Sequence, residues 1–121
     1  MGAAALDRTF QALADPTRRG VVELLRGEPR RAGELAAALR TSPPALSRHL
    51  RVLRQTGLVE EEALPGDGRV RLLRLRAEPF AELRGWLDEL ERFWAGQLAS
   101  FKAHAEAAAA PPDRKPAGRR R

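Results

Sequence analysis

The segment TSPPALSRHLRVLRQTGLVEEE, residues 41–62, constrains the fold more than any other part of the chain. Ser42 is a residue type that caps helix N-termini, and Pro43 suits the first helical position because an N–H there has no intrahelical partner. Gly57 suits the left-handed conformation in which many helices end. The sequence therefore predicts a helix that begins after Ser42 and runs to Thr56.

This predicted helix has two different faces. Leu46, Leu50 and Leu53 form one narrow apolar stripe at about 100° per residue. On the opposite side lie Pro44, Arg48, Arg51 and Gln55, with Ser47 and Arg54 on one flank. The chain is nearly balanced in charge before its last eleven residues, and no acidic residue lies between Arg40 and Thr56. We therefore expect a leucine-anchored helix that offers a basic face to an anionic partner.

The rest of the chain predicts helices and one β-hairpin. Three helices are expected before residue 41: around residues 6–13, from an Asp15 cap to Gly27, and over residues 32–39. The extended runs LVEEEAL and RVRLLRLR flank PGDG, and we expect a hairpin with a Gly-Asp-Gly turn. The register of the second run is ambiguous between Leu72 and Leu73.

A long last helix is expected over about residues 79–106. It carries an a/d seam interrupted by Gln97, with Trp86 and Phe93 beside it. The seam residues are Phe80, Leu83, Leu87, Leu90, Trp94, Gln97 and Phe101. The predicted fold is mainly α with a β-hairpin wing, an α+β winged helix-turn-helix domain over residues 1–110. A disordered basic tail is expected over residues 111–121.

Composition excludes several classes of function. The chain has no cysteine, which excludes disulfides, thiolate metal sites and a cysteine nucleophile. Its N-terminus does not resemble a secretory signal, and no apolar run approaches the ~20 residues that span a bilayer. We expect a soluble cytoplasmic protein without a membrane partner. No nucleophile, paired-acid or metal constellation indicates an enzyme.

Two short helices joined by a tight turn, the second displaying Ser and Arg, are typical of a helix-turn-helix. Such a helix fits the major groove, where Arg donates two hydrogen bonds to guanine. An ordinary solvated helix face would explain the same arginines. The hairpin directly after the helix favours DNA binding, because a basic wing there reaches the neighbouring backbone.

The segments ALADPTRRGVVELL, GELAAAL and SPPALSRHLRVLRQTGLV resemble the ArsR/SmtB type of winged-helix repressor over roughly residues 6–76. The pattern Leu46-Ser47-x-His49-Leu50-x-x-Leu53 carries most of this resemblance. It implies a homodimeric repressor that binds double-stranded DNA at an inverted-repeat operator, through residues 42–56 and the wing 58–76. The DNA-binding residues expected on the helix and wing are Thr41, Ser42, Pro44, Ser47, Arg48, His49, Arg51, Arg54, Arg69 and Arg71.

The resemblance also implies a dimer interface made by the first and last helices. An apolar seam of three heptads exceeds what one small domain can cover, so a second copy is the expected partner. The interface residues expected on this basis are Leu6, Phe10, Leu13, Leu83, Leu87, Leu90, Trp94 and Phe101.

Metal sensing does not transfer from the family to this chain. Metal-sensing members carry thiolates at the start of the third helix, where this chain reads RRAGEL. His104 and Glu106 are two residues apart and do not share a helical face, so no metal site and no cofactor are expected. Because no metal is expected as the effector, an unknown small molecule or protein is the expected effector instead.

Two local interpretations stay open at this stage. His49 lies beside the leucine stripe, where it packs at the helix edge or donates to a phosphate. Glu60, Glu61 and Glu62 face the arginines of the second strand, and cross-strand pairing would leave fewer of these for DNA. Arg69, nearest the tip, is therefore a better candidate than Arg74.

Two functions from other classes compete with the sequence-specific repressor. A non-specific architectural or RNA-binding protein would use mainly the basic tail. A protein-interaction module would retain the winged helix without binding DNA, and the acidic strand is its support. The ratio of specific to random-sequence affinity at fixed salt separates these alternatives, because backbone contacts carry no sequence information.

Overall fold

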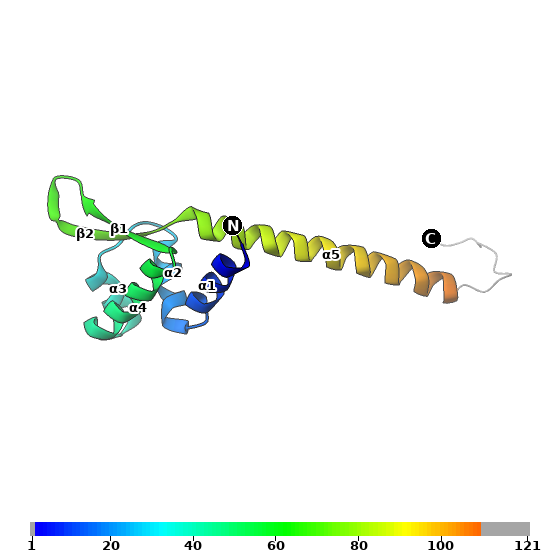
Figure 1. Ribbon diagram of the computed structural model, residues 1–121. Helices are drawn as coiled ribbons and strands as arrows, with labels where there is room; N and C mark the ends of the chain where they lie inside the picture. Colours follow the sequence, from blue (N-terminus) through cyan, green and yellow to red (C-terminus); the bar gives the residue numbers. More distant parts are fainter. Residues whose placement is uncertain (1, 110–121) are drawn as a thin grey trace. The chain divides into compact units, whose positions relative to one another are not determined.

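The structure is a computed structural model of the 121-residue chain and describes residues 2–109. Chain contacts divide it into two units, residues 1–85 and residues 86–121. The elements in order (Figure 1) are α1 (Ala3–Leu13), α2 (Pro16–Leu25), α3 (Ala32–Leu39), α4 (Pro43–Gln55), β1 (Val59–Leu64), β2 (Asp67–Leu75) and α5 (Ala77–Ala109). The expected fold class, mainly α with a β-hairpin, is confirmed. The tail predicted at residues 111–121 lies outside the described residues.

The predicted starts of α2 and α4 are confirmed by their hydrogen bonds, whereas α1 and α5 begin at Ala3 and Ala77, earlier than expected. The Asp15 carboxylate accepts from the backbone N–H groups of Thr17 at 2.8 Å and Arg18 at 3.1 Å, which are otherwise without intrahelical partners. The Ser42 hydroxyl accepts from the backbone N–H of Ala45 at 3.3 Å. Local chemistry alone therefore sets where α2 and α4 begin.

A glycine stands one residue beyond the C-cap of both α2 and α4. Helix α4 ends at Gln55 with Thr56 as its C-cap, and Gly57 follows with φ 83°, a left-handed conformation that glycine adopts without a Cβ clash. Helix α2 ends at Leu25 with Arg26 as its C-cap, and Gly27 follows without a positive φ. Neither glycine is itself the C-cap, and the expected left-handed glycine is found at Gly57 and not at Gly27.

The turn between α3 and α4 is three residues long and tightly bonded. Arg40 adopts φ 54° and ψ 44°, an uncommon left-handed conformation for a residue with a Cβ. The backbone N–H of Thr41 donates to the Ala36 carbonyl at 3.1 Å, which closes the end of α3. This turn joins the two helices of the helix-turn-helix (Figure 1).

The hairpin turns one position earlier than the sequence predicts. Pro65 and Gly66, with φ 89° at Gly66, connect the strands as in a type II turn, and Asp67 already belongs to β2. The expected Gly-Asp-Gly turn is therefore wrong, because the proline supplies the bend. An irregularity between Ala63 and Leu64 shifts the register near the tip.

The ambiguity between Leu72 and Leu73 is resolved by burial. Leu73 is 1% exposed, and its backbone N–H and carbonyl both bond with Arg30, in the loop between α2 and α3. This bridge adds a third chain segment beside the two-stranded sheet. Leu73 therefore faces the core, and Leu72 lies on the opposite side of β2.

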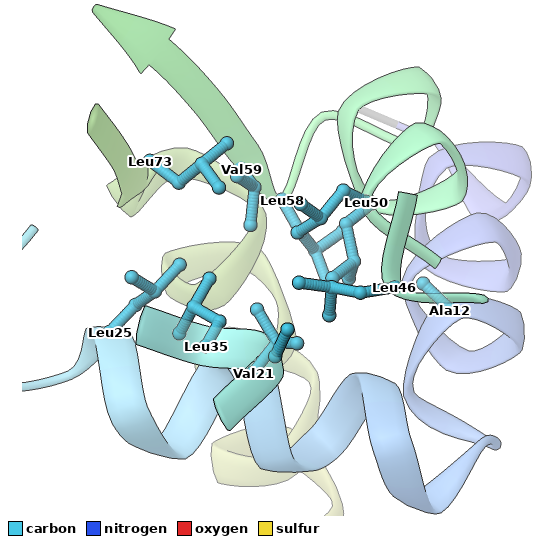
Figure 2. Packing of buried hydrophobic residues seen from close by; sticks show 11 residues of the cluster. Ala12, Val21, Leu25, Leu35, Leu46, Leu50, Leu58, Val59 and Leu73 are labelled. Carbon is cyan, nitrogen blue, oxygen red and sulfur yellow. The ribbon is translucent and has the colours of Figure 1, made fainter. Parts of the chain in front are cut away.

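The core lies among α2, α3, α4 and the base of the hairpin (Figure 2). The α4 stripe is fully inside it, with Leu46, Leu50 and Leu53 at 1%, 4% and 0% exposure. The other buried apolar residues are Ala12, Val21, Leu25, Leu35, Ala36, Leu58, Val59 and Leu73. Helix α5 contributes no buried residue. The leucines thus fix which side of α4 faces outward.

Candidate nucleic-acid interface

The outer face of α4 carries basic side chains that are exposed and have no partner within residues 2–109. Pro44, Ser47, Arg48 and Arg51 are exposed, opposite the buried leucine stripe. Within residues 2–109, neither Arg48 nor Arg51 makes a side-chain hydrogen bond or an ion pair. These two guanidinium groups are therefore available to an external ligand.

The N-terminus of α4 lies beside this face. Ser42 is exposed and Thr41 is half-buried, and both precede the first turn of the helix. Because Pro43 and Pro44 have no N–H, fewer backbone donors are available here than at an ordinary helix N-terminus. Of the predicted residues from Thr41 to Arg51, Thr41 and His49 are half-buried and the others are exposed.

Arg54 and Arg71 are held by a glutamate of the hairpin. Arg54 Nη1 lies 3.3 Å from Glu61 Oε2, and Arg71 Nε lies 3.5 Å from Glu61 Oε1. Both arginines were expected to contact DNA, and the structure places them against the same carboxylate instead of leaving them unpaired. Sequence reasoning missed the Arg54 contact, because the strand register alone brings Glu61 to α4.

The remaining wing arginines differ in their partners. Arg74 Nε lies 2.8 Å from Glu60 Oε2, and its Nη1 lies 3.5 Å from Glu62 Oε1, which is the expected cross-strand pairing. Arg69 contacts Asp67 at 3.4 Å, and its side chain is 93% exposed. Arg69, next to the tip, is therefore the more available of the two.

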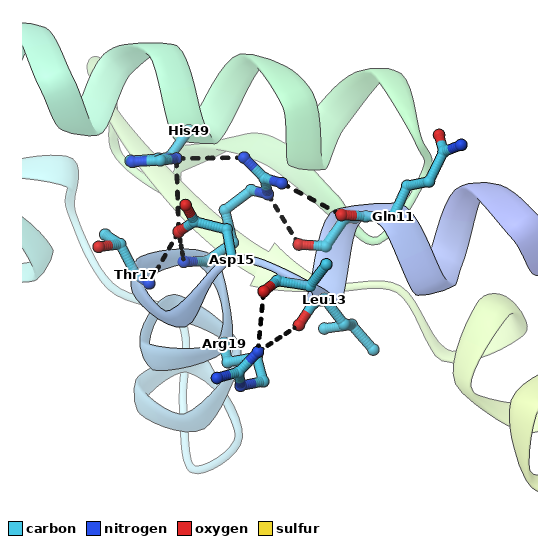
Figure 3. Close-up of polar contacts among 9 residues, drawn as sticks. Gln11, Leu13, Asp15, Thr17, Arg19 and His49 are labelled. Carbon is cyan, nitrogen blue, oxygen red and sulfur yellow. Dashed lines mark hydrogen bonds and ion pairs between the residues drawn. The ribbon is translucent and has the colours of Figure 1, made fainter.

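His49 joins α4 to the beginning of α2 (Figure 3). Its Nδ1 lies 3.3 Å from Arg18 Nη1 and 3.9 Å from Asp15 Oδ1. Since a guanidinium only donates, Nδ1 accepts in the Arg18 contact, and that arrangement leaves the hydrogen on Nε2. Arg18 is itself anchored, because its Nε donates to the Ala12 carbonyl at 2.7 Å. His49 thus has a structural partner in Arg18, which lies 31 residues earlier in the sequence.

The electrostatics of this cluster favour an ionised Asp15. The hydrogen bond from the Arg18 backbone N–H lowers the pKa of Asp15 below its ordinary 3.8, and partial burial opposes this effect. The nearby His49, the Thr17 N–H and the Arg18 charge lower the pKa further. The Asp15 carboxylate therefore caps α2 and also faces the imidazole ring of His49 on α4.

The residues expected at a dimer interface fall into two groups. Phe10, Leu87, Leu90, Trp94 and Phe101 are 41%, 49%, 39%, 54% and 71% exposed. Leu6, Leu13 and Leu83 are half-buried, and Leu13 packs against the core of its own unit. Sequence reasoning missed Leu98, which is 60% exposed and follows Trp94 by four residues. Leu98, rather than Gln97, continues the apolar stripe of α5.

Metal ligands do not gather in the part of the chain that the structure describes. Residues 2–109 contain no group of three or more His, Asp or Glu side chains that could hold an ion. The start of α3 presents Arg31, Ala32 and Gly33, which supply no thiolate. No candidate metal centre is therefore found within residues 2–109 of one chain. Of the described helices, none combines the length and apolar character needed to cross a bilayer.

The arrangement of α3, the tight turn, the exposed α4 and the β1–β2 hairpin defines a winged helix-turn-helix DNA-binding domain. Comparisons with known proteins agree. Residues 15–61 match the family of bacterial regulatory proteins of arsR type. The HTH-type transcriptional regulator Rv2034 of Mycobacterium tuberculosis is 42% identical over 95 residues, 78% of this chain and 83% of that protein. The transcriptional repressor SdpR of Bacillus subtilis is 36% identical over 56 residues, 46% of this chain and 62% of that protein.

Solved structures give the same result. An ArsR-like transcriptional regulator from Rhodococcus sp. RHA1 has a TM-score of 0.71 at 31% identity, covering 86% of this chain and 93% of that chain. The homodimeric winged helix-turn-helix domain Mb0332 from Mycobacterium bovis has a TM-score of 0.59 at 25% identity, covering 74% and 80%. The chain belongs to the ArsR family of transcriptional regulators, a family of regulators and not of enzymes.

Proposed function

We propose that this chain is a homodimeric repressor that reads an inverted-repeat operator through residues 42–56 and the wing 58–76. One observation carries the proposal: Arg48 and Arg51 project from a helix whose other face is fixed by buried leucines, and they have no partner among residues 2–109. A fixed helix presents its donors in a defined orientation, which base reading requires.

The chemistry of the exposed face suits the major groove. A guanidinium donates two parallel hydrogen bonds to guanine O6 and N7, and Ser47 can bond to bases or phosphates. Pro44 offers an apolar contact beside them. Arg69 on the wing and the Nε2–H of His49 are the proposed phosphate contacts, because neither group is fully occupied inside the domain.

A second copy of the chain is the proposed occupant of the apolar face of α5. Leu87, Leu90, Trp94 and Phe101 are exposed in one copy, and contiguous apolar stripes of this length mark interfaces. The homodimeric state of the Mycobacterium bovis domain supports this choice. A two-fold dimer would place two α4 helices on half-sites about one helical turn apart.

Control of this repressor is proposed to be independent of metal. The chain has no cysteine, and its two histidines, His49 and His104, lie far apart in sequence. Zinc centres usually need four ligands and soft ions need sulfur, so operator affinity should be the same with chelator, zinc, cadmium or arsenite. An organic ligand or a protein partner is the proposed signal.

The test begins with selection of bound sequences from a pool of random duplexes. The selected site should bind at least about 1,000-fold more tightly than random DNA at the same salt. Arg48→Ala should cost about 1–3 kcal/mol on that site and relax the preference at one base pair. Arg92→Ala, which removes the same charge from α5, is the matched control and should keep the preference.

Other outcomes would contradict the proposal in distinct ways. Tight binding to every sequence equally, lost when residues 111–121 are deleted, would indicate a non-specific architectural protein. Weakening of Arg48→Ala by the same factor on all sequences would reassign Arg48 to a phosphate contact. No binding to any duplex would leave the protein-interaction module as the function.

A further inference from the structure

Glu61 occupies an unusual position for an acidic residue in a DNA-binding wing. Its two carboxylate oxygens contact two arginines from different elements, Arg54 of α4 at 3.3 Å and Arg71 of β2 at 3.5 Å. The Arg54 contact also has hydrogen-bond geometry. A single carboxylate therefore joins the exposed helix to the far strand of the hairpin.

The strand register explains why Glu61, and not its neighbours, makes these contacts. Glu61 pairs with Leu73, and Leu73 is buried in the core. Side chains alternate along a strand, so Glu61 points to the helix side of the hairpin while Glu60 and Glu62 point away. Glu62 accordingly contacts Arg74, at 3.5 Å, as its one ion-pair partner within residues 2–109.

The surroundings of the Arg54–Glu61 pair strengthen it. The two side chains line a hollow of about 290 Å³ whose floor includes Ala36, Leu46 and Leu50. An ion pair with apolar groups on one side is less screened than a fully solvated pair. Arg54 and Glu61 are 40% and 34% exposed, so the Arg54 guanidinium stays within reach of an external anion.

We infer that Glu61 is an internal competitor for DNA phosphates that suppresses sequence-independent binding; this rests on the proposed DNA-reading function. While Glu61 holds Arg54 and Arg71, the free protein offers mainly Arg48, Arg51 and Arg69 to DNA. Phosphate contacts raise affinity for every sequence alike. Withholding two arginines therefore lowers affinity for random DNA and leaves base reading to α4.

Two variants of the same strand test the inference. Glu61→Gln removes the shared carboxylate, and Glu62→Gln removes an equal charge from the adjacent residue on the other face. Arg74 keeps its 2.8 Å contact with Glu60 in the control. Both substitutions preserve side-chain size, and thermal unfolding should confirm that both variants are folded.

The first measurement is affinity for a random-sequence duplex as a function of salt. Each freed arginine that reaches a phosphate adds about 0.9 to the slope of log K against log salt. Glu61→Gln should steepen the slope by about 0.9–1.8 beyond Glu62→Gln and bind roughly three- to tenfold more tightly. Equal slopes and affinities for the two variants would overturn the inference.

The second measurement needs no DNA. In the free protein, nuclear magnetic resonance of arginine side chains should find restricted guanidinium rotation at Arg54 and Arg71 and free rotation at Arg48. Glu61→Gln should release both arginines, and Glu62→Gln should release neither. Free rotation at Arg54 and Arg71 in the unmodified protein would overturn the inference. A wild-type protein that shows the restriction but binds no duplex would contradict the proposed function alone.

Discussion

Helices α4 and α5 carry apolar stripes of the same helical spacing, yet their burial in the single chain is opposite. Leu46, Leu50 and Leu53 of α4 are at most 4% exposed. Leu90 and Leu98 of α5 are 39% and 60% exposed. Periodicity therefore identifies the apolar face of a helix but does not say whether the partner of that face lies in the same chain.

The first prediction contrasts a leucine of each stripe. Leu53→Ala should lower the free energy of unfolding by about 2–5 kcal/mol, because it leaves a cavity in a closed core. Leu98→Ala, measured at a concentration where the chain is monomeric, should change it by less than about 0.5 kcal/mol. Chemical denaturation measures both free energies of unfolding. Similar losses for the two variants would show that the α4 and α5 stripes do not differ in their burial within the single chain.

The second prediction concerns assembly. Leu90→Glu should raise the dimer dissociation constant by at least about 100-fold, because it buries a charge without a partner. Operator affinity should fall with it, while residues 1–85 stay folded. Ala99→Glu, on the opposite side of the helix, is the control. Sedimentation distinguishes the two, and a Leu90→Glu protein that stays dimeric would place the interface elsewhere.

The third prediction concerns Asp15, which caps α2 and lies beside His49 of α4. Asp15→Ala should destabilise the domain by about 1 kcal/mol near neutral pH, because two N–H groups lose their acceptor. The lowered pKa of Asp15 means that its ionised form is favoured by folding. Its contribution is therefore complete above the ordinary value of 3.8 and is lost as pH falls through the lower folded-state pKa.

Unfolding measured across acidic pH checks that sign. The difference between the wild type and Asp15→Ala should shrink below pH 3.8. Asp15→Asn keeps an acceptor without the titrating charge, so it should be the milder variant near neutral pH. A difference that grows on acidification would show that the carboxylate is not stabilised by folding.

The smallest expected effect comes from the basic C-terminal segment, which lies outside the described residues. Residues 111–121 contain five basic residues and one acidic residue, a net charge of +4. Their deletion should flatten the salt dependence and leave the selected sequence unchanged, because these charges act through counterion release. A new consensus after deletion would show that this segment reads bases.

Local chemistry made much of this fold predictable. The residues Asp15, Pro16, Ser42 and Pro43 mark the starts of α2 and α4 because capping depends on neighbours in sequence. The bounds expected for α3, residues 32–39, also agree with the structure. The leucine face of α4 followed from helical geometry alone.

What sequence reasoning missed depends on contacts between distant residues. The Arg18–His49 contact joins residues 31 positions apart, and no periodicity encodes it. Glu61 reaches Arg54 only because the strand register turns it toward the helix. A strict heptad placed the seam of α5 at Gln97, whereas an unsupercoiled helix brings Leu98 onto the same face. The predicted DNA and dimer contacts stay predictions.

The backbone bridge between Arg30 and Leu73 fixes the base of the wing to the rest of the domain. The two hydrogen bonds of this bridge, 3.1 Å and 2.8 Å long, hold the C-terminal part of β2 to the loop between α2 and α3. Beyond it, the irregular pairing at Ala63 and Leu64 leaves the tip connected mainly through its turn. The Leu73 amide should therefore exchange its hydrogen slowly while amides near Gly66 exchange quickly. This pattern of exchange would mean that Arg69 can adjust to the curvature of a bound surface without a change in the core.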